Sequence, residues 1–358
     1  MPPTPPAPAP GDMRPGVTAM HLQKRAASRQ RRLQFIGTIE RARQSKVLTY
    51  VTASRPPFGA QIGMDAIRIF RDQLGTLGKV KQLDLLLITR GGDTLVPLRL
   101  MSLLREFASR VSVLVPYMAH SSGTLIALGA DEIVMGAMGE LGPVDPSVAN
   151  QFNPILEADD QPGPANSVKP RPRIPISVED VISYITFAKE DAGLDTEGMA
   201  QAHTALTANV HPLAIGNILR THKLIRHLAK KLLAMHMGDG EQEKIGSIVK
   251  SLTENLYAHN YVITRTEAPQ LGLKFASPTA DVEDAMWQLY LEYEAALGFD
   301  VPVNMLQELG SLHQKYMCFD FAVIESQVGG SVNCLTGMAS KSGTDAAFNV
   351  ETQGWQSL

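Results

Sequence analysis

The feature that most constrains the fold is an alternation, from Lys46 onward, of short apolar runs with longer amphipathic segments. The apolar runs are typical of strands buried on both faces of a sheet, and they cover residues 47–53, 83–89, 111–116 and 132–135. Between them, residues 64–77 and 94–109 carry apolar side chains at helical spacing. The alternation predicts an α/β fold, with ββα or doubly wound units around a mainly parallel sheet.

Length and composition narrow the class of protein. The chain has 358 residues, enough for one large domain or two small ones, and its net charge of -3 gives no reason to expect nucleic acid as the main partner. The two cysteines, Cys318 and Cys334, flank a predicted hairpin; they could pair, but so few argue against a secreted disulfide scaffold, and we expect reduced thiols. No apolar run reaches the length of about 20 residues that a spanning helix needs, and the first residues lack the apolar core of a signal peptide. We therefore expect a cytoplasmic protein.

Changes in composition divide the chain into four parts. Residues 1–20, rich in Pro, Ala and Gly, are predicted to form a disordered tail, and residues 21–45 a basic amphipathic helix that docks on the protein, a membrane surface or nucleic acid. Residues 46–300 are the main domain, with a long loop at 151–175 and helices at 177–189, 212–236, 240–258 and 282–297. Residues 301–358 are predicted to be a separate appendage: a helix at 305–315 and a hairpin of 319–326 and 331–335 that turns at Gly329 and Gly330.

Candidate chemistry gathers at the ends of two predicted strands. Gly91 and Gly92 follow the strand at 83–89, where open α/β sheets bind their ligands, and glycine lets backbone N–H groups approach a ligand closely. After the next strand, Ser121 stands directly before a helix that begins at Ser122. Ser121 is either the N-cap of that helix or a nucleophile, beside which the N–H groups of the glycine pair and Ser122 would stabilise an oxyanion. The residues by themselves leave both readings open.

Three motifs make the pattern specific: Leu-Ile-Thr-Arg-Gly-Gly-Asp at 87–93, Ser-Ser-Gly-Thr at 121–124 and Leu-Gly-Pro-Val-Asp-Pro at 141–146. With the segment 264–273, they resemble the Clp-fold serine peptidases of the Clp/crotonase superfamily, in particular the serine dehydrogenase proteinase family, which is similar to signal peptide peptidase A and to the Clp protease proteolytic subunit. The resemblance covers about residues 30–300 and implies a Clp-fold peptidase domain over 46–300. It also implies Ser121 as the nucleophile, with Ser122 where the family has Ala, and an oxyanion hole at Gly91 and Gly92.

The same resemblance implies a base for Ser121. Asp145 lies where the Clp peptidase carries its histidine, and His259 lies close to where that peptidase carries its aspartate. We therefore predict His259 as the general base and Asp145 as the residue that orients it. Lys169 is an alternative base, because it precedes a helix much as the base lysine of signal peptide peptidase A does, and His211 is a third candidate. His120, next to Ser121, is expected to form a wall of the pocket.

These residues predict a serine endopeptidase that hydrolyses a peptide or protein substrate through an acyl-enzyme on Ser121. Two other classes stay open: a crotonase-like acyl-CoA enzyme, in which the glycine N–H pair would stabilise an enolate, and a non-catalytic oligomeric scaffold. The sequence has no nucleotide-binding motif and no metal-ligand spacing, so no cofactor and no metal are predicted. The resemblance implies a homo-oligomer with its interface within residues 212–258, while association with a membrane is left open.

Overall fold

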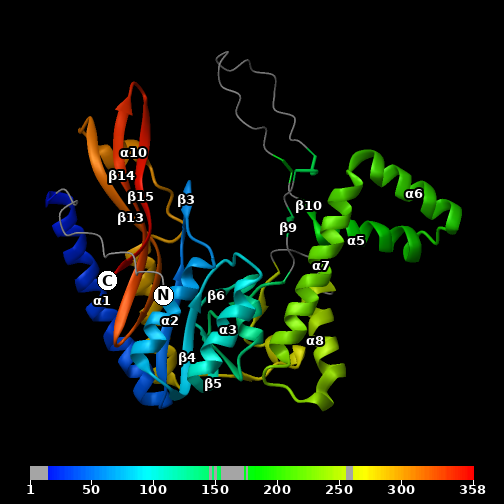
Figure 1. Cartoon of the computed structure of the whole chain (residues 1–358), viewed down its shortest axis with the longest axis horizontal. Coiled ribbons are helices and arrows are strands. Elements are labelled where there is room, and N and C mark those ends of the chain that lie inside the picture. Colours follow the sequence, from blue (N-terminus) through cyan, green and yellow to red (C-terminus); the bar gives the residue numbers. More distant parts are fainter. Residues whose placement is uncertain (1–14, 145–146, 149–150, 155–172, 175, 255–260) are drawn as a thin grey trace, which may run out of the picture.

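The centre of the protein is an eight-stranded sheet with the strand order β12-β7-β5-β4-β1-β13-β14-β15 (Figure 1). The computed structural model describes residues 15–144, 147–148, 151–154, 173–174, 176–254 and 261–358. Four parallel pairings join β1 (Lys46–Thr52), β4 (Val80–Ile88), β5 (Ala108–Val115), β7 (Glu132–Met135) and β12 (Phe275–Ala276). The mixed α/β class predicted from the sequence is confirmed, whereas its finer description as ββα units stays a prediction.

Helices cover both faces of the sheet, which explains why the parallel strands are apolar throughout. In β4, Leu83, Leu85 and Leu87 belong to one core, while Leu86 and Ile88 belong to a second core on the opposite face. The first core is closed by α2 (Asp65–Leu77), α3 (Val96–Phe107), α4 (Ser122–Leu128), α7 (Pro212–Leu233) and α8 (Gln242–Glu254). The second is closed by α1 (Pro15–Arg43) and α9 (Ala280–Leu297).

The N-terminal helix is longer than predicted. α1 begins at Pro15, so residues 15–20 are helical and not part of the predicted tail, of which residues 1–14 lie outside the described residues. Four of its arginines bind carboxylates of sheet strands: Arg25 binds Asp320, Arg29 and Arg32 bind Glu325, and Arg43 binds Asp84. Much of the basic charge of this helix therefore holds it on the protein itself.

The C-terminal residues do not form the separate appendage that the sequence predicts. β13 (Gln314–Ser326) pairs antiparallel with β1, and β14 (Gly329–Ser342) and β15 (Asp345–Ser357) continue the same sheet. The predicted hairpin exists, but its strands are longer and its turn lies at residues 327–328. The helix predicted at 305–315 is the short α10 (Met305–Leu309), which ends at Gly310 with φ 55°. The prediction failed because an apolar strand such as β1 shows that its faces are buried, but not whether its edge is paired.

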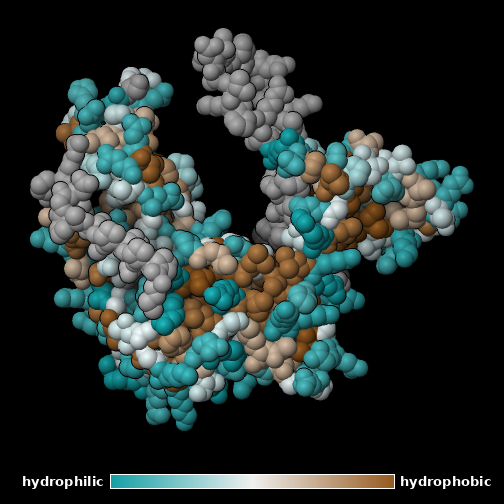
Figure 2. Space-filling view, viewed as in Figure 1, coloured by the Kyte–Doolittle hydropathy of each residue, from teal (hydrophilic) through white to brown (hydrophobic). Residues whose placement is uncertain are grey.

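A helical arm projects from the main body (Figure 1). It consists of α5 (Val178–Thr186), a π-helical turn (Phe187–Asp191), α6 (Thr196–Asn209) and the start of α7. The sequence prediction omits α6, and no residue of α6 is buried. Figure 2 shows apolar surface on this arm, where Phe187, Leu213 and Leu219 are exposed.

The short elements complete the described fold. β6 (Met118–Ala119), β8 (Glu140–Leu141) and β11 (Ile263–Thr264) form a small three-stranded sheet beside the large one. The remaining pairs are β2 (Ser54–Arg55) with β3 (Phe58–Gly59), and β9 (Ser147–Val148) with β10 (Ile176–Ser177). Single 3-10 turns cover Asp239–Glu241 and Ala268–Leu271. Within the described ranges, no helix is both long and apolar enough to cross a membrane.

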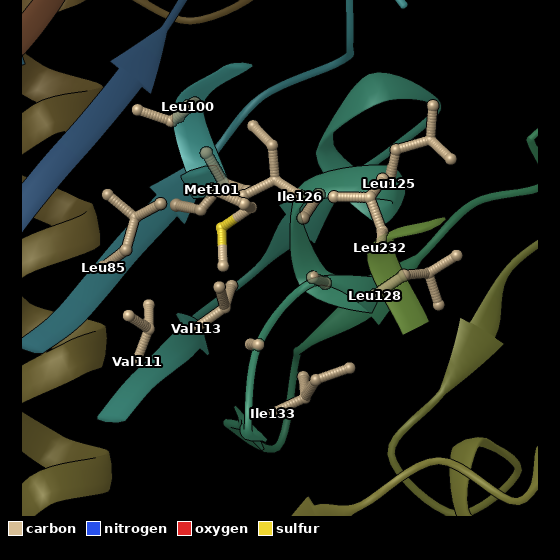
Figure 3. Packing of buried hydrophobic residues seen from close by; sticks show 14 of the residues in the cluster. Leu85, Leu100, Met101, Val111, Val113, Leu125, Ile126, Leu128, Ile133 and Leu232 are labelled. Atoms are coloured by element: carbon tan, nitrogen blue, oxygen red, sulfur yellow. The ribbon is translucent and has the colours of Figure 1, made fainter. Parts of the chain in front are cut away.

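The helix that follows Ser121 is held deep in the first core. Every residue of α4 is buried, and Figure 3 shows Leu125, Ile126 and Leu128 among side chains from the sheet, α3 and α7. At Gly123, a Cβ atom would lie 2.6 Å from Cγ2 of Thr89, so glycine lets the helix approach the end of β4. Close packing of this kind fixes the start of α4 relative to the carboxyl ends of β4 and β5.

Candidate active site

Ser121 occupies a strained turn between β6 and α4. Its backbone angles are φ 53° and ψ -114°, and it is one of three non-glycine residues with positive φ in the described part of the chain. Although Ser121 stands at the N-cap position, its side chain makes no capping hydrogen bond. A strained, half-buried serine on a sharp strand-to-helix turn, with a hydroxyl that does not cap the helix, has a geometry that suits a nucleophile.

Gly91 lies directly against this serine. Its φ is 113°, and a Cβ atom at this position would lie 2.7 Å from Ser121 Cβ and 3.1 Å from Ser121 Oγ. Both backbone groups of Gly91 are already bonded: the N–H donates to Thr89 Oγ1 at 3.0 Å, and the carbonyl accepts from the N–H of Ile62 at 2.8 Å. Gly91 therefore provides room beside Ser121, while its own N–H has a partner.

Gly92 is fixed by a β-bridge to Ile62. The Gly91 carbonyl and the Asp93 N–H both bond to Ile62. In an extended chain, the N–H and C=O groups of successive residues point to opposite sides. The N–H and C=O of Gly92 therefore point away from Ile62. There the carbonyl accepts a 2.7 Å hydrogen bond from Ser122 Oγ. Among the described residues, neither the Gly92 N–H nor the Ser122 N–H, at the first position of α4, has a hydrogen-bond partner. Two donors beside Ser121 therefore have no partner among the described residues and could bind a ligand.

Thr124 ties the Leu-Gly-Pro-Val-Asp-Pro segment to the start of α4. Its buried hydroxyl oxygen lies 2.9 Å from the Ala119 carbonyl, 2.8 Å from the Gly142 carbonyl and 3.2 Å from the Gly142 N–H. Two residues further on, the Val144 N–H donates to the Leu252 carbonyl near the end of α8. The chain that leads to Asp145 is therefore anchored both to the helix after Ser121 and to the helix before His259.

His120 faces Glu140 across the small sheet. Its Nε2 lies 2.9 Å from Glu140 Oε1, close in distance but poorly aligned, since this nitrogen has no hydrogen-bond partner of good geometry in the described structure. Burial lowers the pKa of His120 below its usual value, although the carboxylate of Glu140 acts in the opposite direction. At neutral pH the imidazole is accordingly uncharged, and it packs against Gly142. Its place as a wall of a substrate pocket stays a prediction.

The four other predicted partners of Ser121 differ in what the structure shows. Asp145, His259 and Lys169 lie outside the described residues. His211 is described: its ring stacks on Phe152 with centroids 4.9 Å apart, and its Nδ1 accepts the N–H of Leu213 as the cap of α7. These contacts give His211 a local role at the base of the arm, and the structure does not bring it against Ser121.

Sequence reasoning missed two residues that shape the site. Ile62, in the segment before α2, fixes Gly92, and Thr89 binds the N–H of Gly91 while its own hydroxyl lies 2.7 Å from that of Thr52. Thr89 belongs to the motif at 87–93, but Ile62 lies 30 residues before Gly92 and no local pattern marks it. Among the described residues, the one group of metal-ligand type, His21, Cys318 and Asp320, lies on α1 and β13, not beside Ser121.

Comparison with known proteins defines the class to which this fold and site are related. The sequence model of the ClpP-like SDH-type serine proteinases matches residues 17–169, which include Gly91, Gly92, Ser121 and Asp145 but not His259. The family predicted from the motifs is confirmed over this segment.

Two relatives are similar over a longer stretch. Uncharacterized protein MJ0137 of Methanocaldococcus jannaschii is 26% identical over 270 residues, which cover 72% of this chain and 78% of the relative. Uncharacterized protein MJ1495 of the same organism is 26% identical over 250 residues, which cover 68% of this chain and 71% of the relative. The similarity thus extends beyond residue 169, although neither relative carries a described activity in its name.

Proposed function

We propose that this protein is a serine peptidase that forms an acyl-enzyme on Ser121. The observation that carries the proposal is the strained, uncapped position of Ser121 against Gly91, next to the free N–H groups of Gly92 and Ser122. A nucleophile and two donors that converge on one place match the needs of acyl transfer. The match to the serine proteinase family over residues 17–169 supports the same function.

The oxyanion hole that we propose differs in one residue from the sequence prediction. The N–H groups of Gly92 and Ser122 are the donors, because each is without a partner in the described structure. Gly91, predicted as a third donor, contributes space, since its N–H already donates to Thr89 Oγ1. Loss of one such donor costs about 10²–10³-fold in rate in a serine peptidase.

His259 and Asp145 remain the proposed base and orienting residue. The support comes from the antiparallel pairing of Leu141 in β8 with Ile263 in β11. Asp145 follows Leu141 by four residues, and His259 precedes Ile263 by four residues, so the chain leads to both candidates from the same end of this pair. Lys169 and His211 are the alternatives, and the contacts of His211 with Phe152 and Leu213 count against it. His120 is a further candidate, because its imidazole is uncharged and adjacent to Ser121.

The reaction follows from these roles. The base accepts the proton of Ser121 Oγ as the oxygen attacks the peptide carbonyl carbon, and the carbonyl oxygen, now negative, accepts the two backbone N–H bonds. The C–N bond breaks, the base returns the proton to the leaving amine, and the acyl group stays on Ser121. A water molecule then repeats the attack and releases the acid, which regenerates the serine.

Fluorophosphonate labelling tests the nucleophile. We expect the parent protein to be labelled on Ser121 and to degrade an unfolded protein substrate, and Ser121→Ala to lose both activities. Labelling that persists in Ser121→Ala would show that the assignment is wrong. If the protein is not labelled by the probe but binds acyl-CoA, and Ser121→Ala still binds it, the crotonase-like alternative is favoured. Stable oligomers that show neither probe labelling nor protein degradation would favour the scaffold.

Assembly into a homo-oligomer also stays a proposal. The arm exposes apolar side chains on α7 that a second copy could cover, such as Leu213 and Leu219 (Figure 2). Light scattering checks this, and a monomer at micromolar concentration would count against it. A cytoplasmic location remains a prediction, as does a peptide or protein substrate.

A further inference from the structure

The chain contains only two cysteines, and the fold brings them to one place on the sheet. Cys318 lies on β13 and Cys334 on β14, where Cys318 pairs with Thr336 and Asp320 pairs with Cys334. The two cysteines are therefore diagonal neighbours on the same face of an antiparallel pair. Both are free thiols; Cys334 is buried and Cys318 is half-buried. Their proximity agrees with the sequence, in which they flank a predicted hairpin.

Arg25 of α1 is packed against this pair. Its guanidinium donates to both carboxylate oxygens of Asp320, at 2.8 and 2.5 Å, and its Nη2 lies 3.4 Å from Cys318 Sγ. His21, one turn earlier, lies 3.2 Å from Asp320 Oδ2. His21, Cys318 and Asp320 resemble a set of metal ligands, but the cationic position between Asp320 and the thiol is taken by Arg25. The surroundings suit a thiolate better than a metal ion.

The two thiols share one ionisation. The neighbouring Cys318 thiol lowers the pKa of Cys334 to about 7, and the positive charge of Arg25 acts in the same direction against the cost of burial. The same interaction raises the pKa of Cys318, which keeps its proton. A thiolate next to a thiol and an arginine is the arrangement of a reactive cysteine pair.

A small molecule can approach this cluster. A cavity of about 330 Å³ lies between α1, the end of α9 and the strands β13 and β14. His21, Arg25 and Asp320 line it, and the last two of these contact Cys318, although neither cysteine lines the cavity itself. The cavity is large enough to admit a hydroperoxide.

We propose that Cys318 and Cys334 are a redox-sensitive pair that a hydroperoxide converts into a disulfide. The Cys334 thiolate attacks one oxygen of hydrogen peroxide, the O–O bond breaks, and Cys334 becomes a sulfenic acid as hydroxide leaves. The Cys318 sulfur then attacks the sulfenic sulfur, the S–S bond forms, and the displaced hydroxyl leaves with the Cys318 proton as water. In total, two thiols and one hydrogen peroxide give one disulfide and two water molecules.

The position of the pair makes this disulfide reversible. Diagonal neighbours in a sheet have Cα atoms about 7–8 Å apart, slightly beyond the usual range for a disulfide. The strands must therefore shift a little, and the irregular register between Asp320 and Ala322 lies next to the pair. A strained disulfide is easily reduced, as expected of a regulatory rather than a structural bond.

Peroxide treatment of the reduced full-length protein tests the proposal. Free thiols are blocked with N-ethylmaleimide, and the protein is digested without reductant and analysed by mass spectrometry. We expect a peptide pair joined through Cys318 and Cys334, an intact mass lower by two hydrogens, and full reversal by dithiothreitol. Cys318→Ser and Cys334→Ser should each abolish the crosslink. Sulfinic acids or unreacted thiols in the parent protein would overturn the proposal.

Arg25→Gln tests the part played by the guanidinium. Without it, the pKa of Cys334 should rise, because the guanidinium is one of the groups that lower it, and disulfide formation at about pH 7 should slow several-fold. Arg29→Gln is the matched control on the same helix, because Arg29 binds Glu325 and the Ser326 carbonyl instead of the thiols, and its rate should equal that of the parent. Equal rates of disulfide formation in the two variants would contradict the proposed role of Arg25. So would stoichiometric binding of zinc that blocks both thiols and that is lost when Cys318 is replaced.

Discussion

Gly91 touches the side chain of Ser121 so closely that a Cβ atom at position 91 would lie 2.7 Å from the serine Cβ. Gly91→Ala should therefore push Ser121 out of position and also strain a backbone with φ 113°. A shift of about 1 Å in a reacting group can cost about 10²-fold, and we expect at least this loss in the rate of fluorophosphonate labelling.

Gly78→Ala is the control for backbone strain in the Gly91→Ala experiment. Gly78 has φ 73°, but nothing lies within 4 Å of an added Cβ atom, so the substitution strains the backbone without touching Ser121. Its labelling rate should match that of the parent protein, and circular dichroism should show that both variants are folded. A Gly91→Ala protein that is labelled at the parent rate would refute the close approach.

Ser122→Ala tests which of the two serine hydroxyls in the Ser-Ser-Gly-Thr motif reacts with the probe. The substitution keeps the backbone N–H that we assign to the oxyanion hole and removes the 2.7 Å hydrogen bond from Ser122 Oγ to the Gly92 carbonyl. One neutral hydrogen bond contributes about 1 kcal/mol, so we expect labelling on Ser121 to slow by no more than about tenfold. Mass spectrometry of the labelled peptide checks the site, and a label carried by Ser122 in the parent protein would contradict the assignment.

The base is best identified by comparing His259→Gln with His120→Gln. If His259 is the base, its substitution should reduce the labelling rate by about 10²–10⁴-fold, and Asp145→Asn should also reduce it. His120→Gln should keep the rate within about tenfold, because the imidazole is directed toward Glu140. The reverse order of effects would make His120 the base. Lys169→Met and His211→Gln should leave the rate unchanged, and a large loss in either would favour that alternative.

The buried strands of the fold were predictable, whereas the edge strands were not. The strand predicted at 83–89 is β4, Val80–Ile88, because a strand between two helical layers must be apolar on both faces. β15 has no buried residue, so its existence depends on hydrogen bonds to β14 rather than on its own side chains. Pairing between β1 and β13 joins residues about 270 positions apart in sequence, and no local pattern records it.

The candidate site shows a similar division. The glycine pair after a buried strand and the serine before a helix can be recognised in the sequence, because each lies next to an element that the local sequence pattern predicts. The choice between a helix cap and a nucleophile depended on the backbone angles of Ser121 and on its missing capping bond, which only the three-dimensional structure shows. The partner that fixes Gly92, Ile62, comes from a different segment for the same reason.

Glu325 should be essential for stability, since it joins the C-terminal strands to both helices of the second face. It is fully buried and accepts hydrogen bonds from Arg32 of α1, at 2.5 and 3.1 Å, and from the Tyr293 hydroxyl of α9 at 2.6 Å. Glu325→Gln leaves the buried guanidinium without its counter-charge and should lower the free energy of unfolding by about 3–5 kcal/mol. Urea denaturation measures this. Glu308→Gln, which removes an exposed pair with Lys315, is the control and should have little effect.

Mild acid should destabilise the protein through histidines whose pKa is lowered by burial, of which His236 is the clearest. Its Nε2 lies 3.0 Å from the Leu128 carbonyl at the end of α4, so the neutral ring holds the helix that follows Ser121. Because the folded state resists protonation, the unfolded chain binds the proton first, and the free energy of unfolding should fall as the pH drops below about 6.5. The burial of His120 and His222 acts in the same direction.

Urea denaturation at about pH 7.5 and about pH 5.5 measures the effect of His236, in a range where ordinary carboxylates are still mostly ionised. His236→Gln is the informative variant, because its amide can still donate to the Leu128 carbonyl but cannot titrate. The loss of stability between the two pH values should be smaller in this variant than in the parent protein. A parent protein that is equally stable at both pH values would contradict the prediction, and an equal loss in the variant would assign the effect to other groups.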